Sequence, residues 1–400
     1  MSEMLSVEEA LERLLEGLSP MSSERVPLAD ALGRVPASRP VAAHDVPPFA
    51  NSAMDGFALR VADGGAARRV IGESRAGGPP SPVVEPGTAV RIMTGAPMPV
   101  GADSVVPIED ASESDGSLAV QGSPRPHAHV RDAGHDVAAG TAVALPAGPI
   151  TASVIGLLAA MGEAAVEVRR RPRVAILSTG DELGAVGVPL GPGQIHDANG
   201  PALAAAVSEA GGEPIAVERA RDDVADVEHR IREGAEAADL LIVSGGVSVG
   251  EHDHVRAIIE RLGALDFWRI AVQPGKPLAF GHVEGRPVIG LPGNPVSALV
   301  TFELFVRPML RCMLGLAGDG RAHVTARIDE EVAKDPARRA YLRVRLCSDG
   351  AGYRAASAGG QASSQLLPLA FANALLVVPD GVAATVPGDS YEAIVTGAVE

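Results

Sequence analysis

The sequence is poor in cysteine and in aromatic residues, and each shortage excludes a class of protein. Only Cys312 and Cys347 occur among 400 residues. Neither a disulfide framework nor a cysteine-rich metal site can be built from two cysteines, so a reducing intracellular compartment is expected. We predict that both are buried as small apolar residues. Aromatic residues make up only 3% of the chain, so its cores must be aliphatic.

The chain also lacks long apolar runs and an excess of positive charge. No basic start with an apolar stretch and a small-residue cleavage site opens it, and no window approaches the ~18 unbroken apolar residues of a membrane span. A cytoplasmic location is therefore expected. The net charge is −16, from 34 Lys+Arg against 50 Asp+Glu, which argues against nucleic-acid and membrane partners. A phosphate ligand would need a local binding device.

The length allows two to four domains at roughly 150 residues each. Ser6 and Glu9 form a capping-box pattern ahead of an amphipathic helix. Short apolar runs broken by Gly and Pro fill residues 42–137 and predict an irregular β-rich unit. A second helix is expected over 150–161, where the chain could return to the opening helix. Residues 324–399 predict a small β module.

Strands and helices alternate between residues 173 and 314. The expected strands cover 174–177, 214–217, 240–243, 267–272, 278–280 and 288–291. The expected helices cover 201–210, 223–238, 254–262 and 296–314. Elements of these lengths in alternation predict a mostly parallel sheet with helices on both faces.

Four of these strands are followed by Gly- or Pro-rich polar loops, at 178–182, 244–250, 273–277 and 292–295. Each alone is an ordinary turn, but all four should open on the carboxyl edge of the sheet, where ligands bind. Gly245 and Gly246 would let backbone N–H groups approach an anion, with Ser244 and Ser248 as hydroxyl donors. Lys276 would add a positive charge. Pro295 would begin a helix whose N-terminus favours anions.

Carboxylates stand in or close to strand-end loops: Asp181 and Glu182 in the first loop, Asp222 and Asp223 after the next strand, and Glu251 and Asp253 after the Gly-Gly loop. Beside a phosphate they would repel it unless a divalent cation bridges the two, which predicts a Mg²⁺–phosphate site. N-capping is the alternative for Asp222 or Asp223 and for Asp253. A zinc site at His252 and His254 is disfavoured, because alternate residues at a loop–helix junction rarely face one point.

Several motifs together resemble one known family. They are Pro-Pro-Phe-Ala-Asn-Ser-Ala-Met-Asp-Gly-Phe-Ala at 47–58, Arg-Ile-Met-Thr-Gly-Ala-Pro-Met-Pro at 91–99, Gly-Ala-Asp at 101–103, and the stretches 178–183, 193–199, 244–250 and 291–295. In this order they resemble the MoeA family of molybdopterin molybdenumtransferases and the related C-terminal half of gephyrin. The resemblance spans nearly the whole chain.

The resemblance implies a multidomain α/β fold with four parts. These are a discontinuous linker domain (1–41 plus 138–172), a β-rich second domain (42–137), a central, mostly parallel α/β molybdopterin-binding domain (173–320) and a C-terminal β-barrel (321–400). It also implies a homodimer, with the cleft between the α/β domain of one subunit and the second domain of its partner. Asp55 and Thr94 would then reach the cleft from the partner.

The implied reaction is the last step of molybdenum cofactor biosynthesis. Molybdate is inserted into adenylylated molybdopterin with release of AMP and with Mg²⁺ as cofactor, and the molybdopterin adenylyltransferase is a possible partner. By residue matching, the catalytic set is Asp55, Thr94, Glu182, Asp222 and Asp253, of which Glu182 and Asp253 would bind the metal. The matched pterin-binding set is Ser178, Thr179, Gly180, Asn199, Ser244, Gly245, Gly246, Ser248, Gly250, Lys276, Pro292, Gly293, Asn294, Pro295, Arg343 and Ser363.

The sequence departs from the family pattern in places. Gln273 stands where members often carry Lys, which removes one cation from the expected oxyanion site, and His196, Ala198 and His135 replace commoner residues. One rival function is the molybdopterin adenylyltransferase, which shares the α/β domain but lacks the segments 51–58 and 91–99. The other is a gephyrin-like scaffold without activity, against which the intact acidic set argues.

Overall fold

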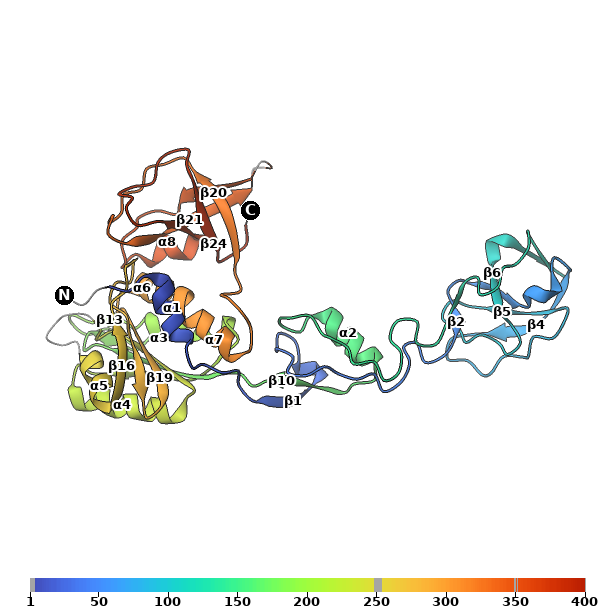
Figure 1. The fold of residues 1–400 in the computed structure, drawn as a ribbon, viewed down its shortest axis with the longest axis horizontal. Coiled ribbons are helices and arrows are strands. Elements are labelled where there is room, and N and C mark those ends of the chain that lie inside the picture. Colours follow the sequence, from blue (N-terminus) through green and yellow to red (C-terminus); the bar gives the residue numbers. More distant parts are fainter. Residues whose placement is uncertain (1–3, 248–253, 349, 351, 400) are drawn as a thin grey trace. The chain divides into compact units, whose positions relative to one another are not determined.

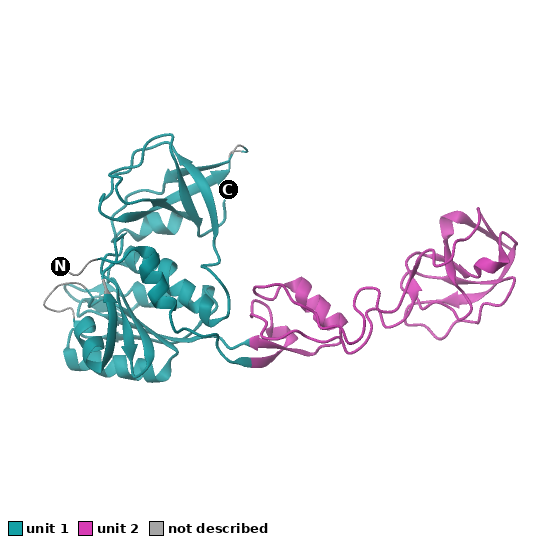
Figure 2. Cartoon of the chain, viewed as in Figure 1, with its two compact units in different colours: residues 1–23, 169–400 teal, residues 24–168 magenta. Residues whose placement is uncertain are grey.

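The computed structural model describes residues 4–247, 254–348, 350 and 352–399. The chain forms two compact units, residues 1–23 with 169–400 (unit 1) and residues 24–168 (unit 2), coloured separately in Figure 2. No helix in the described part of the chain is long and apolar enough to cross a membrane.

Unit 2 contains a small helical part and a β-rich part. In the first, α2 (Ala152–Ala160) packs over strands β1 (Ser23–Pro27) and β10 (Ala165–Arg169) around a core that includes Ile150 and Leu158. Thr151 caps α2, because its hydroxyl accepts a hydrogen bond from the Val154 N–H. The helix expected over 150–161 is confirmed.

The β-rich part of unit 2 has a six-stranded sheet in the order β6-β3-β5-β4-β8-β7 and the short pair β2–β9. Its core is aliphatic except for Phe57. The strands are β2 (Asn51–Ser52), β3 (Gly56–Leu59), β4 (Arg68–Ser74), β5 (Thr88–Ile92), β6 (Ser104–Pro107), β7 (Ala111–Ser114), β8 (Ser117–Val120) and β9 (Val130–Arg131). The predicted irregular β-rich unit is confirmed.

The central part of unit 1 is a six-stranded sheet in the order β14-β11-β15-β19-β18-β16 (Figure 1). The first four strands are parallel, and β18 is antiparallel to both of its neighbours, β19 and β16, so the mostly parallel sheet is confirmed. The reversal comes from a two-residue turn at Glu284 and Gly285, which both have positive φ (51° and 78°), as a type I′ hairpin turn requires. The strands are β11 (Arg173–Thr179), β14 (Glu213–Ala220), β15 (Leu240–Ser244), β16 (Gly263–Trp268), β18 (Ala279–Val283) and β19 (Arg286–Leu291).

Helices cover both faces of this sheet because alternate strand residues point to opposite sides. Val174 and Ile176 of β11 join a core with α3 (Asn199–Glu209), α6 (Pro295–Thr301) and α7 (Arg307–Met313). Ala175 and Leu177 join a second core with α4 (Val224–Ala237) and α5 (His254–Leu262). The long helix expected over 296–314 is found as α6, a π-helical turn (Phe302–Val306) and α7.

The opening helix α1 (Val7–Leu15) begins with the predicted capping box, in which Ser6 and Glu9 bond each other's backbone N–H. Its buried residues Val7 and Leu14 pack in the core that contains α7. After α2, the chain returns to its N-terminal segment through the pairing of β10 with β1. The prediction was a return to the opening helix, but that helix, α1, belongs to unit 1.

One predicted strand, 267–272, is wrong as a single element. β16 ends at Trp268, and Arg269 has a φ of 94°, which interrupts an extended strand. Val272 then begins β17 (Val272–Gln273), which pairs with β21 of the C-terminal sheet. The segment therefore leaves one sheet and joins another.

The C-terminal part is a β-barrel, as expected. β21 pairs with β22 and also with β23, which closes five strands into a ring in the order β21-β22-β20-β24-β23. Leu342 and Val344 fill the barrel, while Tyr341, Leu375 and Ile394 pack into the core that α1 and α7 share. The elements are β20 (Ala322–Ile328), β21 (Arg339–Ser348), β22 (Tyr353–Ser357), β23 (Ala374–Val378), β24 (Ser390–Val395) and the helix α8 (Leu366–Phe371).

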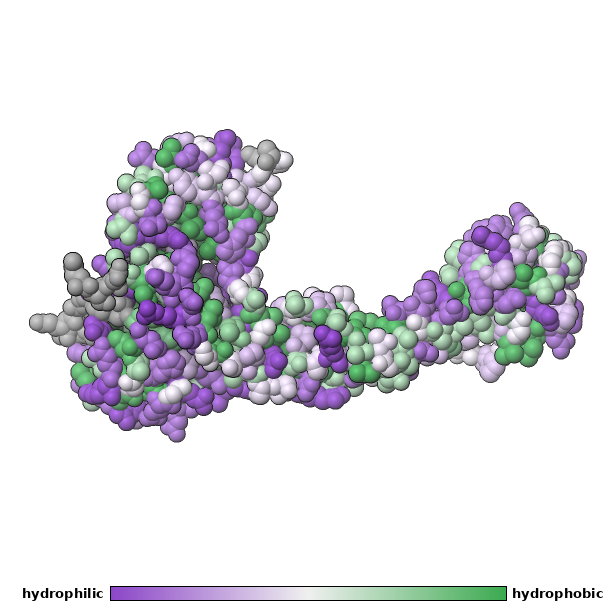
Figure 3. All heavy atoms as spheres, viewed as in Figure 1, coloured by the Kyte–Doolittle hydropathy of each residue, from purple (hydrophilic) through white to green (hydrophobic). Residues whose placement is uncertain are grey.

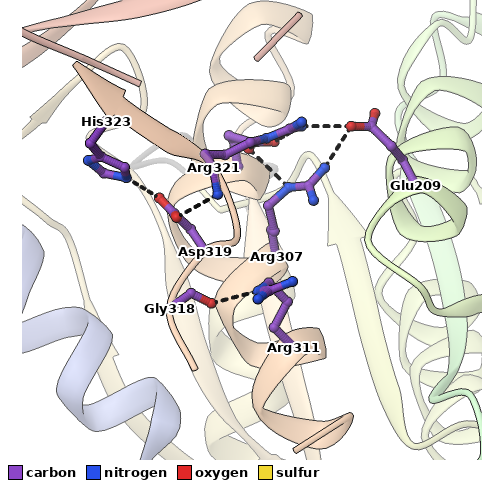
Figure 4. Close-up of polar contacts among 8 residues, drawn as sticks. Glu209, Arg307, Arg311, Gly318, Asp319, Arg321 and His323 are labelled. Carbon is purple, nitrogen blue, oxygen red and sulfur yellow. Dashed lines mark hydrogen bonds and ion pairs between the residues drawn. The ribbon is translucent and has the colours of Figure 1, made fainter. Parts of the chain in front are cut away.

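Ion pairs reinforce the junction between α7 and the barrel (Figure 4). Glu209, at the end of α3, accepts hydrogen bonds from Arg307 (2.8 Å) and Arg321 (2.7 Å). His323 lies between Asp319 (2.8 Å) and Glu392 (2.6 Å), and the hydrogen bond to Glu392, with that to Asp319, raises the pKa of His323 despite its partial burial.

The two cysteines do not share the environment that the sequence predicts. Cys312 is half-buried and Cys347 is exposed. The prediction of burial is therefore wrong for Cys347, which stands on β21 at a position that faces outward from the barrel.

Candidate functional site

A cavity of about 550 Å³ lies at the carboxyl ends of the parallel strands β11, β15 and β19 in unit 1. The described residues that line it come from the loops after these strands, the start of α3 and the barrel. They are Thr179, Gly180, Glu182, Leu183, Ile195, His196, Asp197, Ala198, Asn199, Asp222, Ser244, Gly245, Gly246, Val247, Pro277, Pro292, Gly293, Asn294, Pro295 and Ser364. The predicted convergence of strand-end loops on one edge of the sheet is confirmed.

The first loop follows β11. Ser178 is buried and its hydroxyl donates to Asp197 at 3.2 Å, so it supports the loop and is not in the lining. Gly180 is in the lining, and a Cβ there would meet the Glu182 carboxylate at 2.4 Å, so the acidic side chain folds back over the glycine. Only glycine leaves room for that arrangement.

Two carboxylates join this loop to the loop after β14. The Asp181 N–H donates to Asp222 (3.4 Å), and the Asp222 N–H donates to Asp181 (3.2 Å). Asp223 caps α4 by accepting from the Ala225 and Asp226 N–H groups, so the N-cap alternative holds for Asp223 and not for Asp222. Asp222 remains in the lining of the cavity.

The glycine loop follows β15, and both glycines have left-handed backbone conformations (φ 98° and 66°). The Gly245 N–H donates to the Leu291 carbonyl at 3.0 Å, so this amide, expected to face an anion, is used inside the protein. The Gly246 N–H has no acceptor within the described ranges. One of the two predicted amide donors is therefore available.

Asn199 connects the loops. Its side-chain amide donates to the Ser244 hydroxyl at 2.8 Å and to the Gly293 carbonyl at 2.7 Å. Ser244 in turn donates to the Pro292 carbonyl at 3.4 Å. Both side chains were predicted to bind the pterin, and in this structure their hydrogen-bonding groups hold the second and fourth loops together at the cavity wall.

The third loop contributes least to the cavity. Pro277 lines it, whereas Lys276 is exposed and absent from the lining. Gln273, at the position where a cation was expected, accepts a hydrogen bond from the Asp335 N–H at 2.9 Å and so contacts the barrel side. Pro295 occupies the first turn of α6, as predicted.

The barrel contributes the remaining wall. Ser363 accepts a hydrogen bond from the Asn294 amide (3.0 Å), its carbonyl accepts from the Val296 N–H (3.2 Å), and its neighbour Ser364 lines the cavity. Arg343 is buried, and burial lowers the pKa of its guanidinium to about 10. Its guanidinium donates to the carbonyls of Gly360 and Ala362, so it supports the serine loop and does not line the cavity.

The lining is acidic. It contains Glu182, Asp197 and Asp222, and no Lys or Arg among the residues the structure describes there. Sequence reasoning missed Asp197, which is buried and accepts from Ser178 and from the Gly200 N–H, and also missed Ser364. An anion in this cavity must be held by neutral donors, by a cation that binds with it, or by both.

Unit 2 holds the two remaining predicted catalytic residues, and they contact each other. One Asp55 oxygen accepts from the Thr94 N–H (2.6 Å) and the Thr94 hydroxyl (2.7 Å). The antiparallel register of β3 and β5, which pairs Gly56 with Ile92, brings them together. The hydrogen bond from the Thr94 backbone, with that from its side chain, lowers the pKa of the exposed Asp55 carboxyl.

Three predicted site residues, Ser248, Gly250 and Asp253, lie outside the described residues. So do Glu251 of the carboxylate set and His252 of the zinc alternative. Within the described ranges, no group of three His, Cys, Asp or Glu side chains is arranged to hold a metal ion.

Comparison with known proteins follows the domain pattern. Three family models match the chain: the MoeA N-terminal region (domain I and II) at residues 5–162, a probable molybdopterin binding domain at 175–312, and the MoeA C-terminal region (domain IV) at 325–395.

Similar proteins match along most of the chain. Molybdopterin molybdenumtransferase 2 of Mycobacterium tuberculosis is 40% identical over 97% of this chain and 99% of its own. Molybdopterin molybdenumtransferase of Haemophilus influenzae is 40% identical over 78% of each chain. Two crystal structures of the molybdopterin biosynthesis MoeA protein from Pyrococcus horikoshii match with TM-scores of 0.84 and 0.83, at 32% and 26% identity, and cover 99% and 98% of this chain and 100% of their own.

Proposed function

The chain belongs to the MoeA family, and we propose that it is a molybdopterin molybdenumtransferase that inserts molybdate into adenylylated molybdopterin and releases AMP. The observation that carries this proposal is the cavity at the carboxyl ends of β11, β15 and β19, where neutral donors and carboxylates line one space. A ligand with a phosphate at one end and a metal-binding group at the other matches that mixture.

The proposed reaction needs two kinds of protein group: carboxylates that act on water and hydrogen-bond donors that hold phosphate. The phosphoanhydride of the substrate is hydrolysed: a water oxygen bonds to phosphorus, the P–O–P bond breaks, and AMP leaves. Glu182 and Asp222 line the cavity where this step would occur and can orient the water or accept its proton. The Gly246 amide would hold a phosphate oxygen. The sulfur ligands of molybdenum belong to the pterin, so the chain needs no cysteine there.

The residues present fit a Mg²⁺ ion that binds together with the substrate. The described residues form no complete metal cage, but Mg²⁺ uses one or two carboxylates and completes its shell with phosphate oxygens and waters. We propose Glu182 as one ligand and Asp253 as another, with Asp222 in the same lining. When bound, the ion would neutralise the charge that develops on the phosphate oxygens.

We propose that the active form is a homodimer in the cytoplasm and that Asp55 and Thr94 act in the cavity of the partner. Asp55 is exposed, charged and held by two hydrogen bonds, as expected of a residue that orients a ligand. Hydrophilic and hydrophobic residues are interspersed over the visible face of each unit (Figure 3). Exposed apolar side chains occur at both sites: Met54 (39%) precedes Asp55 in sequence, and Ile195 (57%) is in the lining of the cavity.

The reaction is tested with the purified protein, adenylylated molybdopterin and molybdate. We expect AMP release that requires molybdate and Mg²⁺ and that falls in Glu182→Gln. No molybdate-dependent AMP release would favour the scaffold alternative. ATP-dependent adenylylation of molybdopterin would favour the adenylyltransferase, which would also be the enzyme that supplies the substrate.

The shared site is tested by mixing variants. Asp55→Ala and Glu182→Ala should each be inactive as homodimers. When the two are co-expressed, random pairing should restore roughly a quarter of the wild-type sites, because each heterodimer has one intact site. If both residues served the same subunit's site, co-expression would restore nothing. A monomer in light scattering would also contradict the proposal.

A further inference from the structure

The three hydroxyls at the ends of β11 and β15 differ in whether the protein already uses them. Ser178 donates to Asp197, and Ser244 donates to the Pro292 carbonyl while it accepts from Asn199. The protons of both serines therefore have protein acceptors. The third hydroxyl belongs to Thr179.

Thr179 is buried, at 8% exposure, and its hydroxyl has no hydrogen-bond partner among the residues that the structure describes. A buried hydroxyl without a partner costs free energy, because it has given up water and gained nothing in return. In a native structure such a group calls for an explanation, such as a catalytic role or a water or ion that binds to it. Thr179 lines the cavity, so a ligand there is the partner to consider.

The surroundings of the Thr179 oxygen favour an acceptor-rich ligand group. Cβ atoms on Gly245 and Gly246 would lie 2.7 Å and 3.2 Å from this oxygen, so the glycine loop passes close over it. The Gly246 N–H, which has no acceptor among the described residues, is in the same loop. Two neutral donors near each other, in a lining whose described residues include three carboxylates and no Lys or Arg, suit a phosphate oxygen.

We propose that Thr179 is a specificity-determining residue whose hydroxyl donates to the phosphate of the pterin substrate and selects ligands that carry this group. The proposal rests on the proposed function, because it assigns the phosphate of that substrate to the end of the cavity beside Gly246. It also accounts for a buried hydroxyl that has no partner within the described part of the chain. The cost of the unpaired group is removed when the phosphate binds.

The test compares binding of molybdopterin with binding of its dephosphorylated form, under anaerobic conditions and without molybdate. We expect the wild type to prefer the phosphorylated ligand. Thr179→Val keeps the shape of the side chain and removes the hydroxyl, so it should reduce that preference about 10- to 100-fold. Thr179→Ser keeps the hydroxyl and should therefore keep the preference for the phosphorylated ligand. If the valine variant does not fold, Thr179→Ala gives the same comparison with serine.

A stability measurement separates this role from a structural one. Thr179→Val removes an unpaired buried group, so the melting temperature of the free protein should stay the same or rise. Thr385 is the matched control: it is buried, but its hydroxyl donates to the Glu330 carbonyl (2.8 Å) and accepts from the Val332 N–H (2.8 Å). Thr385→Val should lower the melting temperature and leave the ligand preference unchanged.

The outcomes are distinct. The proposal would be overturned if Thr179→Val kept the wild-type preference. It would also be overturned if Thr179→Ser lost as much of the preference as Thr179→Val. A wild type without any preference for the phosphorylated ligand would also overturn it. A wild type that shows the preference but releases no AMP would refute the proposed reaction and leave the role of Thr179 supported.

Discussion

Replacing Gly245 by alanine tests how closely the glycine loop must approach the end of β11. Gly245 has a φ of 98°, which L-residues rarely adopt. A Cβ built on it would lie 2.7 Å from the Thr179 hydroxyl oxygen and 2.8 Å from the Thr179 carbonyl oxygen. Because the carbonyl belongs to the backbone of a central strand, the strand cannot move aside cheaply, and the glycine loop must shift.

Two costs add in this variant. The backbone strain of a residue with a side chain in this region is about 1–3 kcal/mol, and the forced contact adds about 1–3 kcal/mol. Partial relaxation of the loop keeps the sum near 2–4 kcal/mol of lost unfolding free energy. The relaxation itself displaces the Gly246 amide, so AMP release should fall by about 10-fold or more, since misplacement by 1 Å is costly in catalysis.

The matched control is Gly285→Ala, in the turn between β18 and β19. Gly285 also has a positive φ, 78°, but a Cβ there has no atom within 4 Å. Only the backbone cost remains, about 1–2 kcal/mol, and activity should be unchanged. Urea unfolding gives the two free energies, and AMP release gives the activity. If both alanine variants lost the same stability and kept full activity, the close approach of the loop to β11 would be refuted.

Three further predictions each concern one residue and its hydrogen bonds. Asp55→Asn keeps an acceptor for Thr94 but removes the charge, so AMP release should fall about 100-fold while the thermal melting curve stays that of the wild type; an active variant would contradict the role of the carboxylate. Asn199→Ala removes both hydrogen bonds that join the Ser244 and Gly293 loops and should cost about 1–3 kcal/mol in urea unfolding, and a loss no larger than that of an exposed alanine substitution would contradict the bridging role. The pKa of His323 is raised in the folded state, so its stabilisation is fully present below the unfolded value of about 6.5 and is lost as pH rises through the folded pKa. His323→Gln should therefore be less stable than the wild type near pH 6 and nearly equal to it near pH 9, and a difference that does not change with pH would contradict the pairing with Glu392 and Asp319.

The α/β part was the easiest to predict, because its signals are local. The helix expected over 254–262 is α5 with the same limits, since its apolar residues repeat at helical spacing. The strand expected over 267–272 failed where a single residue, Arg269, takes a positive φ that no apolar pattern records. The antiparallel hairpin at Glu284 and Gly285 was likewise not anticipated.

The loops of the site were located correctly, but the use of each side chain was not. Ser178, Ser244 and Asn199 have polar groups of the right kind for a ligand, and the structure shows them bonded to Asp197, Pro292 and Gly293. These partners lie 19 to 94 residues away in sequence, so no spacing rule reveals them. The charge of Lys276 suits an anion and so predicts a ligand contact, but its exposed side chain is not part of the lining.

Ser364 shows the limit of motif reasoning in another way. It precedes a six-residue helix, α8, in a domain that shares no sheet with β11, and it reaches the cavity because Ser363 bonds Asn294 and Val296. The signal that could have found it is the neighbouring Ser363, which the family resemblance already indicated. Proximity between domains is decided by packing, which a one-dimensional pattern does not contain.

The run from Arg269 to Gln273 passes from the edge of one sheet into the edge of another, and the barrel residues Tyr341, Leu375 and Ile394 share a core with α1 and α7. Genetic dissection of this protein is therefore constrained. A gene fragment that stops before β20 would leave β17 without the strand it pairs with and would expose the aliphatic surface that the barrel covers. Such a fragment should aggregate when expressed. An engineered enzyme that reuses the α/β part must therefore also contain the barrel.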